Sequence, residues 1–158
     1  MNFQVGDQVI HSNYGLGEIV QMDEKVIRGR NTRCYVVRIR DLTLWVPVVD
    51  INKCSLRFPT PKNEFGALFK ILGSPGEPLP QDRIDRKTQL LEDLKDGKLE
   101  GVCRVVRDLW FLRRTKKLNE NDKAILERAR DFLFNEWKLS FSVSSAQAEQ
   151  ELSHLLGE

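Results

Sequence analysis

The stretch EIVQMDEKVIRGRNTRCYVVRIR, residues 18–40, decides the fold of the first part of this chain. Two arms rich in β-branched residues flank Arg28-Gly29-Arg30-Asn31, a segment whose glycine suits the loop of a β-hairpin. On the second arm Tyr35, Val37 and Ile39 fall on one face, which is the period of a half-buried strand. The stretch therefore predicts an antiparallel β-hairpin.

Short strand patterns continue on both sides of this hairpin. Gln8-Val9-Ile10 precedes the glycine turn Tyr14-Gly15-Leu16-Gly17, and Leu44-Trp45-Val46 forms a further strand that Pro47 ends. We expect five short, strongly bent strands within residues 3–58. A small Tudor- or SH3-like β-barrel fits that number of strands in so short a segment.

The sequence period changes to that of a helix after residue 58. Phe65, Leu68, Phe69 and Leu72 make one apolar stripe, with Thr60 as the expected cap and Pro61 at the first helical position. The Gly/Pro-rich segment 73–80 cannot continue a helix and predicts a stiff linker. Further helices are expected at residues 82–95, 99–114, 120–139 and 145–156.

These patterns predict an α+β chain of two small domains. The N-terminal Tudor/SH3-like β-barrel spans residues 1–58, and a connecting helix with the proline-rich linker spans residues 59–80. An all-α domain of four to five helices fills residues 81–158. Asn119 is an expected helix cap, and Ser144 and Ser145 are both candidates for the cap of the last helix.

Composition restricts the function classes. The 158 residues are 41% hydrophobic and 30% charged, without an apolar run long enough to span a membrane and without a secretory signal, so we expect a cytoplasmic protein. Cys34, Cys54 and Cys103 form no CxxC pair, and the histidines are His11 and His154. Neither set indicates a disulfide framework, a metal site or a catalytic triad, so we expect no enzyme, no cofactor and no small-molecule substrate.

Charge is distributed unevenly along the helical part. Residues 81–119 hold 11 Lys/Arg against 7 Asp/Glu, whereas residues 120–158 hold 4 against 8. Cations at the start of a helix are unfavourable for the helix itself, which makes phosphate groups of DNA an alternative partner for them. A solvated helix face would explain the same surplus. The candidate DNA-binding residues are Arg83, Arg86, Lys87, Arg113, Arg114 and Lys123.

The hairpin offers a second candidate surface. A small sheet has exposed edge strands, and a partner's strand can extend such an edge. Lys25, Val26, Ile27 and Arg28 would contact the added strand, although a plain solvated hairpin fits the sequence equally well. Trp45, near the end of another strand, is either part of this surface or half-buried packing.

Short segments in both halves of the chain form an ordered set. They are residues 3–11 (FQVGDQVIH), 14–17 (YGLG), 27–29 (IRG), 35–37 (YVV), 46–48 (VPV), 96–97 (DG), 105–110 (VVRDLW), 117–119 (KLN) and 129–133 (ARDFL). This ordered set closely resembles the CarD/CdnL family of bacterial transcription regulators, and the resemblance covers nearly the whole chain. The first part alone also resembles the polymerase-interacting module of the transcription-repair coupling factor, but that protein lacks this helical half and carries helicase motifs that are absent here.

The resemblance implies a domain that binds the β subunit of RNA polymerase, joined to a helical domain that contacts promoter DNA. The DNA contact lies in the minor groove at the upstream edge of the bubble and favours the open complex. Lys25 matches a basic residue that holds the β subunit, and Trp45 replaces a second one. Arg83 stands where family members carry a tryptophan wedge. The alternative is a polymerase-docking module without effective DNA contact.

Overall fold

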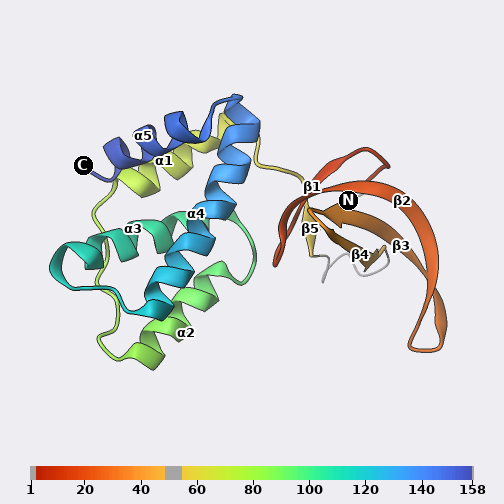
Figure 1. Ribbon diagram of the computed structural model, residues 1–158, viewed down its shortest axis with the longest axis horizontal. Coiled ribbons are helices and arrows are strands. Elements are labelled where there is room, and N and C mark those ends of the chain that lie inside the picture. Colours follow the sequence, from red (N-terminus) through yellow and green to blue (C-terminus); the bar gives the residue numbers. More distant parts are fainter. Residues whose placement is uncertain (1–2, 49–54, 158) are drawn as a thin grey trace. The chain divides into compact units, whose positions relative to one another are not determined.

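The structure is a computed structural model that describes residues 3–48 and 55–157, so Cys54 lies outside the described residues. The chain divides into Met1–Pro59, in which the described elements are strands, and Thr60–Glu158, in which they are helices (Figure 1). The predicted α+β fold in two parts is confirmed. Residues 60–80, predicted to be a connection between domains, belong to the helical unit.

The first unit is a five-stranded antiparallel sheet with the order β4-β3-β2-β1-β5. Its buried apolar residues include the predicted inward set Tyr35, Val37 and Ile39, which pack with Val9 and Ile19. The periodic pattern therefore identified the core face correctly. The strands are β1 (Gln8–His11), β2 (Gly15–Ile27), β3 (Arg30–Ile39), β4 (Leu42–Pro47) and β5 (Leu56–Arg57).

The turn of the β2–β3 hairpin is tighter than the sequence indicated. Ile27 pairs with Arg30, so only Arg28 and Gly29 form the loop, and both have positive φ values of 52° and 76°. Two positive φ angles are the signature of the type I′ turn, which matches the right-handed twist of the strands. The predicted loop of four residues is therefore wrong in length, because Arg30 and Asn31 already pair with β2.

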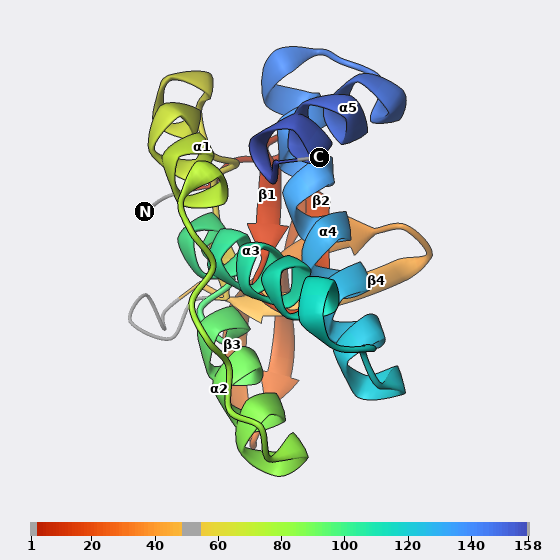
Figure 2. The same ribbon diagram turned by 90° about the vertical axis from the view of Figure 1, so that its left-hand side faces the viewer.

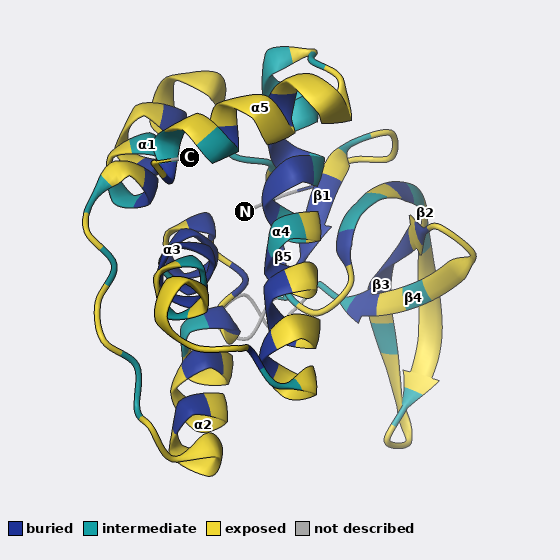
Figure 3. Ribbon diagram, turned by 60° about the vertical axis from the view of Figure 1, so that its left-hand side comes forward, coloured by how far each residue is buried: buried dark blue, intermediate teal, exposed yellow. Residues whose placement is uncertain are grey.

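The second unit is all-α. Its elements are a short 3₁₀ turn (Lys62–Glu64), α1 (Phe65–Gly73), α2 (Arg83–Leu94), α3 (Leu99–Thr115), α4 (Glu120–Phe141) and α5 (Ser145–Leu155). The four helices predicted after residue 80 agree with these bounds to within two residues, whereas α1 begins four residues after the predicted first position, Pro61. Buried and exposed residues occupy opposite sides of α2 and α4 (Figure 3), as amphipathic helices around a shared core require.

The helix caps were only partly predicted. Asn119 and Ser144 both cap their helices in reciprocal capping boxes, with Asp122 and Gln147. Thr60 does not cap a helix, because its backbone N–H and its hydroxyl both donate to Glu136 Oε1 on α4 at 2.9 Å. This contact holds the start of the helical unit against α4. The first turn after Pro61 is a 3₁₀ helix and not the start of α1.

The proline-rich segment after α1 runs past α3 to the start of α2 (Figure 2), and several of its residues contact α3. Arg107 Nη1 donates to Ser74 Oγ at 2.8 Å, and the Glu77 N–H donates to Asp108 Oδ1 at 2.9 Å. Gly76 lies so close to the Phe111 side chain that a Cβ atom would clash there. The segment therefore runs over α3 as a bound loop and carries the chain to the start of α2.

Candidate functional site

Lys25 and Trp45 meet on one face of the sheet. Lys25 pairs with Thr32 and Trp45 pairs with Val36, and both of these partners belong to the same face of β3. The Lys25 ammonium lies 4.3 Å from the centroid of the Trp45 ring, which is a cation–π contact. Trp45 is 38% exposed, so the pair is accessible at the surface. Lys25 and Trp45, which were predicted from different strands, thus form one surface pair.

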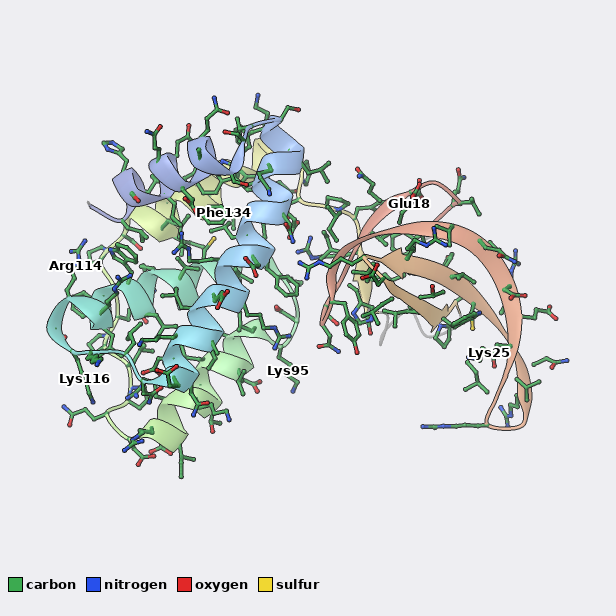
Figure 4. The ribbon with its side chains drawn as sticks, viewed as in Figure 1. Glu18, Lys25, Lys95, Arg114, Lys116 and Phe134 are labelled. Carbon is green, nitrogen blue, oxygen red and sulfur yellow. The ribbon has the colours of Figure 1, made fainter. Side chains whose placement is uncertain are left out.

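The other predicted hairpin residues divide between two faces. Ile27 lies two positions after Lys25 and shares its face, whereas Val26 points to the opposite face and is 65% exposed. Arg28 lies in the turn. Lys25 itself lies on the part of the hairpin beyond the neighbouring strands (Figure 4). We call Lys25, Ile27 and Trp45 the hairpin face; Val26 contributes through its backbone.

The backbone of β2 beyond Ile19 faces no other strand on the side away from β3, within the described residues. Ile27 and Arg30 flank a two-residue turn and therefore exchange hydrogen bonds. Because hydrogen-bonded and non-hydrogen-bonded pairs alternate, the N–H and C=O groups of Val26 and Glu24 point outward. The same reasoning places the outward groups of β4 at Thr43 and Trp45. Among the described strands, none pairs with these outward groups, so both edges can accept an added strand.

Four cations gather around two adjoining cavities of the helical unit. Arg83 and Lys117 line a cavity of about 510 Å³, and Lys117 also lines a groove of about 720 Å³ together with Arg113 and Lys123. All four side chains are exposed. We call Arg83, Arg113, Lys117 and Lys123 the basic face. Lys117 was not among the candidate DNA-binding residues, because the sequence pattern does not show which side chains share a cavity.

Arg86 lies in the core of the helical unit and not on its surface. It is 2% exposed, and its Nε and Nη2 atoms donate to the two carboxylate oxygens of Asp122 at 2.9 and 3.0 Å. Its Nη1 donates to the carbonyl oxygens of Pro80 and Gln81. A guanidinium held in this way cannot reach a phosphate, so we remove Arg86 from the candidate DNA-binding residues.

The remaining two predicted cations lie in different surroundings. Lys87 is exposed on α2, one turn after Arg83. Arg114 donates from Nη2 to the carbonyl oxygen of Leu156 at the end of α5, and it lines neither of the cavities of the basic face. Arg114 and Lys116 both lie at the end of α3 (Figure 4). Lys87 therefore remains a candidate outside the basic face, and Arg114 stabilises the end of α5.

Ile84 is an apolar residue that was not among the candidate site residues. It follows Arg83 in the first turn of α2, and 75% of its surface is exposed. The position at which the family carries an aromatic wedge holds Arg83 in this chain. The signal that could have identified Ile84 is its mismatch with the buried stripe of α2, which consists of Arg86, Leu90 and Leu94.

Groups with catalytic or metal-binding chemistry are sparse. Burial raises the pKa of the Cys103 thiol to about 12 and also raises that of Cys34, while burial lowers the pKa of His11. Within residues 3–48 and 55–157, no three His, Cys, Asp or Glu side chains are placed to hold a metal ion. In the same residues, no helix has the length and apolar character needed to cross a membrane.

Comparison with known proteins matches both units. Residues 3–58 match the family described as "CarD-like/TRCF RID domain", and residues 67–153 match the family described as "CarD, C-terminal domain". The chain belongs to the CarD-like family. This CarD-like chain is also 28% identical over 153 residues to "Putative transcription factor YdeB" of Bacillus subtilis (strain 168), covering 92% of this chain and 96% of that protein. The predicted family is confirmed, and the family is one of transcription factors that are generally non-enzymatic.

Proposed function

We propose that this CarD-like chain binds the β subunit of RNA polymerase through the hairpin face and promoter DNA through the basic face. By holding both, it modulates the stability of the open complex. The observation that carries the proposal is the presence of both family modules in one chain, each with an exposed surface suited to its partner. Neither surface has catalytic chemistry, so the protein acts by binding.

The hairpin face supports the polymerase half of the proposal. The Lys25–Trp45 pair presents a fixed cation and a large apolar ring next to an open strand edge. A strand added at such an edge gains main-chain hydrogen bonds, while the side chains beside it give specificity. The tryptophan that replaces a basic residue keeps Lys25 in position, since a cation–π contact at an exposed site contributes roughly 0.5–1 kcal/mol.

The basic face supports the DNA half. Arg83 and Lys123 are exposed cations at the starts of α2 and α4, and Lys117 is an exposed cation in the loop between α3 and α4. The Arg86–Asp122 ion pair holds the starts of α2 and α4 together. Lysine and arginine contacts to phosphates supply the part of DNA affinity that does not depend on sequence. Ile84 beside them supplies the apolar character that a minor-groove wedge needs, because isoleucine is among the side chains used between base steps.

The test measures both partners with one preparation of the full chain. We expect Trp45→Ala to weaken capture by the isolated β-subunit lobe and to leave promoter affinity unchanged. The Lys117→Ala/Lys123→Ala variant should bind the promoter more weakly and the β-subunit lobe normally. The salt slope of its promoter binding should fall by about two counterions. Arg128→Ala, an exposed cation of α4 away from both cavities, is the control. The proposal would be rejected if Trp45→Ala bound the β-subunit lobe normally and Lys117→Ala/Lys123→Ala bound the promoter normally.

A docking module without effective DNA contact is the second candidate. The observation that favours it is the loss of Arg86 and Arg114 from the predicted set of cations, which leaves a smaller basic surface. Promoter affinity that does not change between low and high salt would select this candidate, because phosphate contacts release counterions and strand addition does not.

A further inference from the structure

The groove of about 720 Å³ beside the basic face has a lining that phosphate contacts alone do not explain. Besides cations, it contains the apolar side chains Leu118, Leu126 and Phe134 and the carboxylates of Glu127, Asp131 and Glu149. Carboxylates repel phosphate, and apolar side chains offer no hydrogen bond or charge that would bind it. A ligand that uses the whole groove must therefore combine an anion, an apolar plane and hydrogen-bond donors.

Most of this lining comes from one side of α4. Lys123, Glu127, Asp131 and Phe134 follow one another at spacings of three or four residues, which places them along one stripe of the helix. Lys123 is nearest the start of the helix, and Asp131 lies about 12 Å further along its axis. Lys117 from the preceding loop joins Lys123 at the cationic end. The groove thus changes from positive to mixed polar and apolar along its length.

The mixed end holds a flat platform and two free acceptors. The Arg130 guanidinium carbon lies 5.5 Å from the centroid of the Phe134 ring, and the Arg130 side chain is 33% exposed (Figure 4 shows Phe134 on α4). Arg130 also approaches Glu149 of α5 at 3.5 Å. Glu127 and Asp131 are exposed and form no hydrogen bond or ion pair with the described part of the chain. Guanidinium planes of this kind stack on unpaired bases.

We propose that this groove receives an unstacked base of single-stranded DNA. The phosphate lies against Lys117 and Lys123, the base stacks over Arg130, and Glu127 or Asp131 accepts hydrogen bonds from the exocyclic amino group of the base. The proposal rests on the proposed DNA contact and specifies the form of DNA that the helical unit binds. An acidic peptide fits less well, because its carboxylates would meet Glu127 and Asp131.

The chemistry predicts a base preference. Cytosine and adenine each carry an exocyclic amino group that a carboxylate can accept from, whereas thymine has none. We expect short deoxycytidylate and deoxyadenylate strands to bind the full chain about fivefold more tightly than a thymidylate strand of equal length, the factor of one net hydrogen bond. Fluorescence anisotropy with end-labelled strands, at fixed salt, measures the three affinities beside that of a duplex.

Substitutions then separate base recognition from charge. Glu127→Ala/Asp131→Ala should abolish the preference while strengthening binding of all strands, because two negative charges are removed. Glu151→Ala, which removes an exposed carboxylate of α5 outside the groove, should keep the preference. Equal affinity for the three strands in the unmodified protein would overturn the proposal, as would displacement of the deoxycytidylate strand by polyglutamate at equal concentration.

The same measurements distinguish this proposal from the proposed function. Salt-dependent duplex binding without a base preference would reject the base-receiving groove and leave the DNA contact standing. Absence of binding to duplex and to single strands alike would reject both. A preference that survives in Glu127→Ala/Asp131→Ala would also reject the groove, since the discrimination would then come from another surface.

Discussion

Arg86 and Lys87 are neighbours in the sequence, yet their surroundings in α2 have nothing in common. Arg86 lies on the inner side of the helix and makes a two-point ion pair with Asp122, whereas Lys87 is exposed. Both had looked like phosphate ligands, because a cation near a helix start has no local partner of its own. Only the position of α2 against α4 decides which of the two turns inward.

The buried pair predicts a large effect on stability. Arg86→Ala should lower the free energy of unfolding by about 3–5 kcal/mol, because the Asp122 carboxylate would remain buried without its partner. Lys87→Ala should change it by less than about 0.5 kcal/mol. Urea unfolding followed by circular dichroism measures both. An Arg86→Ala variant of normal stability that fails in DNA binding would contradict the structural role.

Replacing both partners tests the origin of that loss. In the Arg86→Met/Asp122→Leu variant no charge remains buried, so most of the lost unfolding free energy should return. The double variant should also bind DNA like the unmodified protein, since neither side chain belongs to the basic face.

His11 links the stability of the sheet to pH. Its Nδ1 accepts hydrogen bonds from the backbone N–H groups of Asn13 and Tyr14, and burial lowers its pKa below the ordinary value of 6.5. The unfolded chain therefore binds more protons than the folded chain just below pH 6.5, so the free energy of unfolding should fall as the pH is lowered from there.

A pair of variants isolates this contribution. His11→Asn keeps an acceptor near the Nδ1 position and removes the titration, so its unfolding free energy should depend less on pH between about pH 5 and about pH 7 than that of the unmodified protein. His154→Asn, which replaces the exposed histidine, should keep the original slope. Identical slopes for all three proteins would show that His11 does not control this dependence.

At the scale of elements, local periodicity was enough to predict strands and helices but not their contacts. The alternation around Tyr35 and the stripe of α1 both mark core faces, because burial imposes those periods directly. The turn at Arg28 and the role of Thr60 depend on pairing across the chain, and neither follows from neighbouring residues. The Lys25–Trp45 contact depends on the registers of two hairpins at once, so the sequence could name both residues without joining them.

The open edge of β2 gives the element-scale prediction. Val26→Pro should weaken binding to the β-subunit lobe, because proline removes an outward N–H group and deforms the strand. Val26→Ala should have little effect, since the Val26 side chain points away from the hairpin face. If circular dichroism shows an intact fold and Val26→Pro binds normally, the edge of β2 is not the contact; Thr43→Pro then tests the edge of β4 in the same assay.

At the scale of the whole molecule, the two units have separate cores and separate candidate surfaces. The N-terminal core closes around Val9, Ile19 and Val37, and the helical core closes around residues such as Leu109 and Trp137. A substitution on one surface should therefore leave the other unit folded. This independence allows the two binding activities to be measured in one chain and assigned to different residues.

The last prediction concerns how the start of α2 acts on the open complex. Arg83 and Ile84 are adjacent and exposed, but they would contact DNA in different ways. Arg83 is a cation whose attraction to phosphate is screened by salt, whereas Ile84 is an apolar side chain that can enter between base steps. Arg83→Ala should weaken promoter binding at low salt and reduce the salt slope by about one counterion. Ile84→Ala should leave that slope unchanged and shorten the lifetime of the open complex.

Arg83→Trp completes the series, because it adds an aromatic wedge at the cost of one cation. We expect it to lengthen the lifetime of the open complex, since a ring fills the space between unstacked bases better than a hydrated guanidinium does. Lifetimes of the four proteins, measured with polymerase and promoter at two salt concentrations, separate the two contributions. If all four have the same lifetime and the same salt slope, the start of α2 does not face DNA, and Lys117 and Lys123 must hold the phosphates without it.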